Sequence, residues 1–347
     1  MKYNQLGQTK LRVSELCLGT MTFGEQNTEQ QGHDQLDRAL DYGVNFIDTA
    51  EMYAIPPRAE TFGQTEAIIG RWFRARKNRD RVVLATKVIG KADDFMPYVR
   101  GGMTRLNKHN IELALNDSLR RLNTDVIDLY QIHWPDRNTN FFGRLGYQHQ
   151  PDDSAASIEE TLSVLNTLVA SGKVRAIGVS NETAWGAMEY IRLSGNGVGP
   201  RIASIQNPYN LLNRSYEVAL AEVSHQETVG LLAYSPLAFG VLSGKYLANQ
   251  RPDHARLTLF PSYQRYSNTV AVKATKAYVD LAQEAGLIPS QMALAYVNSR
   301  PFVAATIIGA TTLAQLQENI ASTEVHLSDD VIAEIDAIHQ RWPNPCP

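Results

Sequence analysis

Eight apolar runs of six to nine residues recur along the chain, and each is followed by a segment with apolar residues at helical spacing. The runs cover residues 15–20, 44–50, 81–88, 126–133, 174–181, 202–210, 229–236 and 303–311. Continuous rather than alternating apolar runs are typical of parallel strands that are covered on both faces. The pattern therefore predicts eight parallel strands that alternate with helices.

The segments between the runs carry helix stop signals. Gly43, Gly172 and Gly286 follow amphipathic stretches at the position where a left-handed residue commonly ends a helix. Eight alternations predict one α/β domain over residues 1–347, a single (β/α)8 TIM barrel, whose usual size is about 250 residues before insertions. Residues 1–14, with Gly7, are predicted to form an N-terminal β-hairpin that plugs one end of the barrel.

Three connections are longer than a barrel requires. They follow strands 2, 4 and 7 and cover residues 54–66, 134–157 and about 247–268. Loops at this end of a barrel build active sites, so these three are predicted to be substrate walls. Aromatic residues in and near these connections either line a pocket or pack against the loops themselves. These aromatic residues are Phe23, Tyr53, Trp134, Phe141, Phe142 and Tyr147.

A doubly wound sheet with a glycine-rich nucleotide-binding loop is the main alternative fold. The candidate loop is SGNGVGP at residues 194–200, which does not follow an apolar run and ends in proline. A lone glycine pattern in that setting predicts a surface turn.

Composition excludes several classes of function. The formal net charge is -3, and the one basic stretch, RARKNRDR at residues 74–81, is predicted to close a helix rather than to bind nucleic acid. Cys17 and Cys346 are too few for a disulfide framework or a zinc site, which suggests a reducing compartment. The N-terminus has no signal-peptide core, and no apolar run approaches the roughly 18 residues of a membrane span. We expect a soluble, cytoplasmic protein without a metal site and without nucleic-acid or membrane partners.

Nearly every predicted strand ends in a polar or small residue. These strand ends are Gly19, Thr20, Asp48, Lys87, His133, Ser180, Asn181, Gln206, Asn207, Tyr234, Ser235 and Gly309. Taken singly, an aspartate there is more often a helix cap, a lysine is more often solvated, and a histidine is more often a buried structural residue. The carboxyl ends of barrel strands converge on one mouth, so the alignment of all of them favours one shared site.

Four of the polar residues suggest proton transfer to a carbonyl. Tyrosine, with an ordinary pKa of about 10, becomes a better acid beside a cation, and Lys87 is the candidate cation for Tyr53. Asp48 can keep Lys87 charged, and His133 can orient the carbonyl oxygen as a hydrogen-bond donor. The set has no nucleophile and no paired carboxylates, so an external hydride donor is required, and a nicotinamide cofactor is the natural one.

At these residues the sequence resembles the aldo-keto reductase family over essentially its whole length. The matching pieces are LCLGTMTFG, NFIDTAEMY, LATKV, DLYQIHWPD, GKVRAIGVSN, IQNPYNLLNR, LLAYSPLAFGVLSGKY and IIGATTLAQLQEN. The family's catalytic tetrad falls on Asp48, Tyr53, Lys87 and His133. The resemblance implies reduction of an aldehyde or ketone with Tyr53 as general acid, and a substrate site at Phe23, Tyr53, His133 and Trp134.

The resemblance also implies a cofactor site. The family's contacts fall on Thr20, Met21, Gln26, Asp48, Ser180, Asn181, Gln206, Tyr234, Ser235, Pro236, Leu237, Ala238, Lys245, Gly309, Thr311, Gln315, Glu318 and Asn319. Ser180 and Asn181 would hold the carboxamide, and Tyr234 would stack on the nicotinamide. Many members have a lysine and an arginine near the positions of Gly309 and Gln315 for the ribose 2′-phosphate, and this chain has neither.

The branch of potassium-channel β subunits has a similar pattern of a glycine, a hydroxyl residue and a glutamine at these positions. That branch still takes NADP(H), through a lysine like Lys245 and a nearby arginine. Here either Arg251 or Arg256 is the candidate arginine. We therefore expect NADP(H), with NAD(H) as the alternative. The long loops look most like the bacterial Tas branch. The alternative to an enzyme is an NADP(H)-binding redox sensor or regulatory subunit with little turnover.

Overall fold

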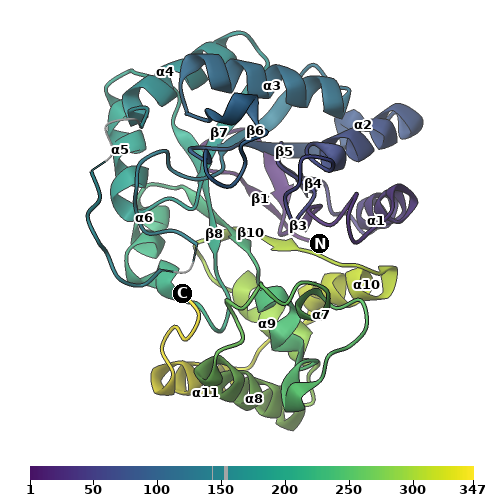
Figure 1. The fold of residues 1–347 in the computed structure, drawn as a ribbon. Coiled ribbons are helices and arrows are strands. Elements are labelled where there is room, and N and C mark those ends of the chain that lie inside the picture. The colour runs from purple at the N-terminus through teal and green to yellow at the C-terminus, as the bar shows by residue number, and fades with distance from the viewer. Residues whose placement is uncertain (143, 152–154) are drawn as a thin grey trace.

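Eight parallel strands close into a barrel in the computed structural model, which describes residues 1–142, 144–151 and 155–347 (Figure 1). The barrel strands are β3 (Leu16–Gly19), β4 (Phe46–Asp48), β5 (Val83–Val88), β6 (Ile127–Ile132), β7 (Val174–Ser180), β8 (Ile202–Pro208), β9 (Gly230–Tyr234) and β10 (Val303–Ile308). Each strand pairs with its neighbour in chain order, and β10 pairs with both β9 and β3. This last pairing closes the sheet and confirms the predicted TIM barrel.

Each strand lies inside the apolar run that predicted it, and all but β5 stop before the run does. The doubly wound alternative is excluded, because that fold has an open sheet. Residues 194–200, its candidate phosphate loop, form the end of helix α5 (Ala184–Gly195) and the turn before β8. The basic stretch at residues 74–81 closes helix α2 (Gln64–Arg76), as predicted.

Helices surround the barrel (Figure 1). They are α1 (Glu29–Asp41), α2 (Gln64–Arg76), α3 (Lys108–Leu122), α4 (Ile158–Ala170), α5 (Ala184–Gly195), α6 (Leu220–Gln226), α7 (Arg256–Leu259), α8 (Thr269–Glu284), α9 (Pro289–Asn298), α10 (Leu313–Ala321) and α11 (Asp329–Arg341). Gly43, Gly172 and Gly286 have φ angles of 85°, 77° and 68°, so the predicted left-handed helix ends are confirmed. Helices α8 and α11 lie against each other outside the ring.

The N-terminal hairpin closes the amino end of the barrel. Strand β1 (Tyr3–Gln5) pairs antiparallel with β2 (Arg12–Ser14), and Leu6 and Val13 are buried in one cluster with residues of the barrel interior. Gly7 has a φ of 55°, and a Cβ there would lie 2.6 Å from the Ala203 carbonyl oxygen. A larger residue would push the hairpin away from β8, which explains the glycine. The plug leaves the carboxyl end of the barrel as the open mouth.

The long connections follow β4, β6 and β9, the second, fourth and seventh strands of the barrel. The second of them contains residues 143 and 152–154, which lie outside the described residues. Within the ranges that the structure describes, no helix is long and apolar enough to cross a membrane.

Candidate active site

Lys87 and Asp48 form a buried ion pair at the carboxyl ends of two neighbouring strands. Asp48 ends β4, Lys87 is the penultimate residue of β5, and the Nζ–Oδ2 distance is 2.6 Å. Lys87 Nζ also donates to the Thr49 carbonyl oxygen at 2.8 Å. The two side chains are 0% and 4% exposed, so their charges act with little screening by water.

The second oxygen of Asp48 is held by two amides from across the barrel. Gln131 Nε2 and Gln206 Nε2 donate to Asp48 Oδ1 at 3.1 and 2.9 Å. The Thr20 hydroxyl donates to the Asp48 carbonyl oxygen at 2.8 Å. The carboxylate therefore has a fixed position. Gln131 was missed at the sequence level, although a glutamine inside the apolar run 126–133 was an available signal.

Tyr53 and His133 lie beside this ion pair. Lys87 Nζ is 5.0 Å from the centroid of the Tyr53 ring, and the Tyr53 and His133 rings meet edge to face with centroids 5.8 Å apart. His133 Nδ1 is buried without a hydrogen-bond partner among the described residues. The four residues expected to form a tetrad are thus brought together.

Burial and neighbouring charges together set the protonation states of Tyr53, Lys87 and His133. Burial raises the pKa of the Tyr53 phenol, and Lys87 opposes this shift without reversing it. The expectation that Lys87 lowers the pKa of Tyr53 below its ordinary value is therefore corrected. Burial lowers the pKa of Lys87, but Asp48 and Tyr53 outweigh it and the net shift is upward. Burial, helped by Lys87, holds the pKa of His133 well below its usual range. At neutral pH the site holds a neutral phenol, a neutral imidazole and a charged ammonium.

The residues expected to hold a carboxamide are bonded to one another. Asn181 Nδ2 donates to the His133 carbonyl oxygen at 2.9 Å, and its Oδ1 accepts from the Tyr234 hydroxyl at 2.7 Å. The Ser180 hydroxyl donates to the Gln206 carbonyl oxygen at 2.7 Å. This network fixes the ring of Tyr234 and the amide of Asn181 next to the tetrad.

A cavity of about 500 Å³, the catalytic cavity, opens over these residues. The predicted site residues in its lining are Thr20, Met21, Asp48, Tyr53, His133, Trp134, Ser180, Asn181, Gln206, Tyr234, Ser235 and Gly309. Phe141 and Phe142 from the second long connection also line it, as does Phe95 from the connection after β5. The aromatic wall suggested by the sequence therefore exists around Tyr53.

A second cavity of about 610 Å³ continues from the first, and both are lined by Thr22, Phe239, Arg256, Ile308 and Gly309. Its predicted residues are Gln26, Pro236, Leu237, Lys245, Gly309, Thr311, Gln315, Glu318 and Asn319. Gln26 Nε2 is buried and has no hydrogen-bond partner within the described chain. The two cavities together form one long cleft across the mouth of the barrel.

Lys245 and Arg256 bring positive charge to the second cavity. Neither forms an ion pair with a carboxylate in the part of the chain that the structure describes. Burial and the neighbouring Arg256 lower the pKa of Lys245, while Glu318 opposes this. A cation held in such surroundings without a carboxylate partner suits an anionic ligand.

In the turn after β9 the side chain of Lys245 packs against Gly240. Ser235, Ala238 and Phe239 have φ angles of 53°, 49° and 58°, and Gly240 follows at 87°. A Cβ on Gly240 would lie 2.8 Å from Lys245 Cε. Successive backbone N–H groups in a turn can form a concavity that favours anions. Because Gly240 has no side chain, the Lys245 side chain can pass close to its backbone at the edge of the cavity.

Three expected site residues lie elsewhere. Phe23, expected to contact substrate, is 0% exposed and belongs to the main core, where its ring packs over Gly32 of α1. It lines neither cavity, so that expectation is corrected. Ala238 is also buried away from both cavities, and Tyr147 is exposed beside His149. Of the two candidate arginines, Arg256 lines both cavities and Arg251 lines neither.

Comparison with known proteins agrees with this geometry. The model of the Aldo/keto reductase family matches residues 15–340. The chain is 52% identical to Protein tas of Escherichia coli over the whole of both sequences. It is 34% identical to the uncharacterized oxidoreductase YrpG of Bacillus subtilis, over 99% of this chain and 97% of that one. It is 31% identical to a probable voltage-gated potassium channel subunit beta of Arabidopsis thaliana, over 99% and 98% of the two chains. The chain belongs to the aldo/keto reductase family of oxidoreductases.

Proposed function

We propose that this protein is an NADP(H)-dependent oxidoreductase that reduces an aldehyde or ketone to an alcohol, with Tyr53 as the general acid. The observation that carries the proposal is the buried Lys87–Asp48 pair, with Lys87 Nζ 5.0 Å from the Tyr53 ring inside the catalytic cavity. A bound reduced nicotinamide would supply a hydride to the carbonyl carbon. The residues of this chain must then supply a proton to the carbonyl oxygen.

Tyr53 suits the role of proton donor because its phenol keeps its proton at physiological pH. The nearby Lys87 ammonium stabilises the phenolate that forms when the proton leaves, and Asp48 keeps the ammonium charged and in place. His133, neutral and next to Tyr53, can donate one hydrogen bond to the same carbonyl oxygen. In the oxidative direction the Tyr53 phenolate would accept the proton of the alcohol.

The donor groups of the cleft fit a nicotinamide dinucleotide. Ser180, Asn181 and the Tyr234 ring lie in the catalytic cavity next to the tetrad and suit the nicotinamide end. Lys245 and Arg256 suit phosphates, and the unpartnered Gln26 amide offers another donor. Two cations without carboxylate partners among the described residues favour NADP(H), which carries one phosphate more than NAD(H).

A regulatory role is the second candidate, because one relative with 31% identity is named as a probable potassium channel subunit beta. In that role the protein would bind NADP(H), turn over very slowly and report cofactor state to a partner. The intact tetrad supports the enzyme over the sensor.

The two candidates differ in steady-state turnover. The test is the oxidation of NADPH and, side by side, of NADH by the pure protein with a nitro-substituted benzaldehyde. Sustained consumption with a preference for NADPH supports the proposed function. Tight binding of NADPH without consumption, across several aromatic and aliphatic aldehydes and ketones, would favour the sensor.

A further inference from the structure

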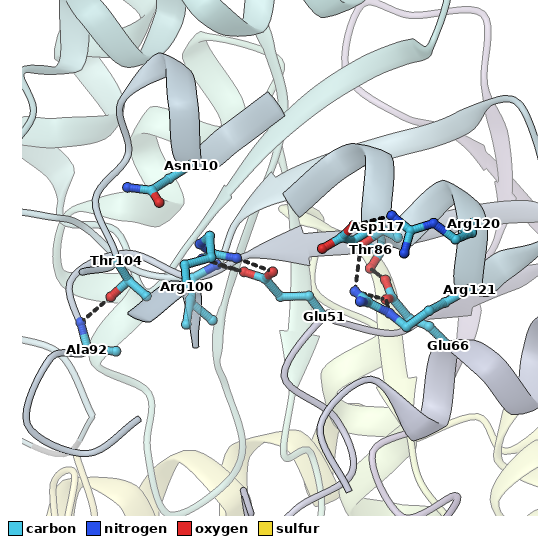
Figure 2. Close-up of polar contacts among 12 residues, drawn as sticks. Glu51, Glu66, Thr86, Ala92, Arg100, Thr104, Asn110, Asp117, Arg120 and Arg121 are labelled. Atoms are coloured by element: carbon cyan, nitrogen blue, oxygen red, sulfur yellow. Dashed lines mark hydrogen bonds and ion pairs between the residues drawn. The ribbon is translucent and has the colours of Figure 1, made fainter. Parts of the chain in front are cut away.

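Glu51 and Arg100 form a second buried ion pair close to the tetrad (Figure 2). Arg100 Nη1 donates to Glu51 Oε2 at 2.6 Å and Nη2 donates to Oε1 at 3.0 Å. The side chain of Arg100 is 8% exposed and that of Glu51 is 1% exposed. A buried ion pair is weak evidence for stability, because desolvation of the two charges offsets their attraction. The pair therefore calls for another explanation.

The backbone of Arg100, which makes this contact, is in a strained conformation. Its φ is 46°, a left-handed conformation that non-glycine residues avoid, and Gly101 and Gly102 follow at 68° and 80°. Such a conformation persists where the surrounding structure imposes it, and it is common at functional sites. The turn directs the guanidinium of Arg100 onto Glu51.

Glu51 connects the segment that carries Tyr53 to the segment that carries Lys87. Its backbone N–H donates to the Lys87 carbonyl oxygen at 3.2 Å, and its Oε1 accepts from the Ile89 N–H at 2.8 Å. The Tyr53 N–H donates to the Ala50 carbonyl oxygen at 3.1 Å, which makes residues 50–53 a tight turn around Glu51. A displacement of Glu51 would therefore move Tyr53 relative to Lys87.

Arg100 belongs to the connection after β5, which also forms a wall of the catalytic cavity. Phe95 from this connection lines the cavity. The chain neighbours of Glu51 and the residue before Arg100 belong to one apolar cluster, and Tyr53 packs against this cluster. The cluster consists of Ala50, Met52, Ile89, Ala92, Met96, Val99 and Trp134. The ion pair is thus the polar link between the turn of the general acid and this wall.

We propose that Glu51 and Arg100 are positioning residues that set the distance between the Tyr53 hydroxyl, Lys87 and the substrate carbonyl. This inference rests on the proposed role of Tyr53 as the general acid. Neither residue touches the reacting atoms, and both act through the turn at residues 50–53. A misplacement of about 1 Å at a catalytic group can lower the rate about 100-fold, so a small shift of the turn is sufficient for a large effect.

A neighbouring ion pair of the same kind provides a matched control (Figure 2). Glu66 is 0% exposed, accepts from Arg121 Nε at 2.7 Å and accepts from the Thr86 hydroxyl at 2.5 Å. These bonds join α2, α3 and the outer face of β5, since Thr86 and Lys87 point to opposite faces of the strand. Among the described residues, none of these bonds reaches residues 48–55 or 89–104.

The test compares Glu51→Gln, Arg100→Met and their double variant with Glu66→Gln in the NADPH-loaded protein. We expect Glu51→Gln and Arg100→Met to lower kcat by about 10- to 100-fold, with cofactor Kd unchanged. The double variant should be no slower than the slower single variant, because both remove one link. Arg100→Lys, which keeps the positive charge but loses the two-pronged guanidinium contact, should recover part of kcat.

The control variant Glu66→Gln should lose stability but keep a kcat close to that of the wild type. Equal kcat values for Glu51→Gln and Glu66→Gln would overturn the inference.

The wild-type rate separates this inference from the proposed function. A wild type without turnover contradicts the proposed function, and amide hydrogen exchange then tests the positioning alone. The N–H groups of Tyr53, Ala54 and Ile55 are all bonded within the fold, so they report on the turn. Faster exchange at these amides in Arg100→Lys or Glu51→Gln than in Glu66→Gln supports the inference, and equal exchange overturns it.

Discussion

Lys87 Nζ lies 2.6 Å from Asp48 Oδ2 in a part of the barrel where neither side chain is more than 4% exposed. The register of the sheet favours this contact, since Asp48 pairs with Ala85, and Lys87, two residues further along β5, points to the same face as Ala85. Two amides hold the other carboxylate oxygen. The ammonium is thereby kept charged beside a neutral phenol, which is the arrangement that a proton donor requires.

Lys87→Met should destabilise the fold as well as slow catalysis. The variant leaves Asp48 buried with two amide donors and no counter-ion, and breaking one partner of a buried pair costs about 3 to 5 kcal/mol. Urea denaturation measures the change in the free energy of unfolding. Adding Asp48→Asn to the same chain removes the unpaired charge and should recover part of the loss. A loss below about 1 kcal/mol in the single variant would mean that the pair is not buried as described.

The stability of the protein should fall as the pH drops below about 6.5, the ordinary pKa of histidine. His133 has a pKa well below that value because of burial and the charge of Lys87, so the unfolded chain takes up a proton that the folded chain does not. This contribution is intact above pH 6.5 and is lost as the pH falls, by at most about 1.4 kcal/mol per pH unit. Burial shifts the pKa of His339 in the same direction. The unfolding free energies of the wild type and His133→Gln at several pH values isolate the share of His133, and parallel pH profiles would contradict it.

The rate of carbonyl reduction should change little between neutral pH and about pH 9. Burial raises the pKa of Tyr53 above the ordinary value of about 10, so the phenol keeps its proton over this range. The dependence of kcat on pH checks this, and a descending limb centred near pH 7 would show that another group donates the proton.

Lys245→Gln and Arg256→Gln should each weaken NADPH more than NADH. A hydrogen bond to a charged group contributes about 1.5 to 3 kcal/mol, which corresponds to about 10- to 100-fold in Kd. Lys273→Gln, an exposed lysine on α8, is the matched control and should change neither affinity. Fluorescence titration measures the dissociation constants of NADPH and NADH for the wild type and each variant, and equal effects on NADPH and NADH would assign these cations to the shared pyrophosphate instead.

The fold was predictable because its pattern is repetitive. Each buried parallel strand lies in a continuous apolar run. Gly43, Gly172 and Gly286 end their helices in a left-handed conformation, which glycine at these positions predicts. The strand ends were less predictable, because the runs continue into the turns that carry the site residues. In β4, for example, the run 44–50 contains a strand of only three residues.

The candidate site was predictable where it depends on the convergence of strand ends at the mouth of the barrel, which brings Asp48, Lys87 and His133 together. The candidate site was not predictable where burial determines a pKa or the direction of a side chain. The direction of the Tyr53 pKa shift depends on the balance of desolvation against Lys87, and Phe23 turns into the core over Gly32 rather than toward the cavity. The partnership of Glu51 with Arg100 depends on a turn 49 residues away in the chain, which no local pattern reveals.

The most direct test of the central claim is a single-turnover measurement on wild type and Tyr53→Phe, each loaded with NADPH and mixed with an aldehyde. The account predicts that both bind NADPH with the same Kd, and that the variant oxidises it at least about 100-fold more slowly, as expected for a lost general acid. Oxidation of NADPH by Tyr53→Phe at the wild-type rate would contradict the account.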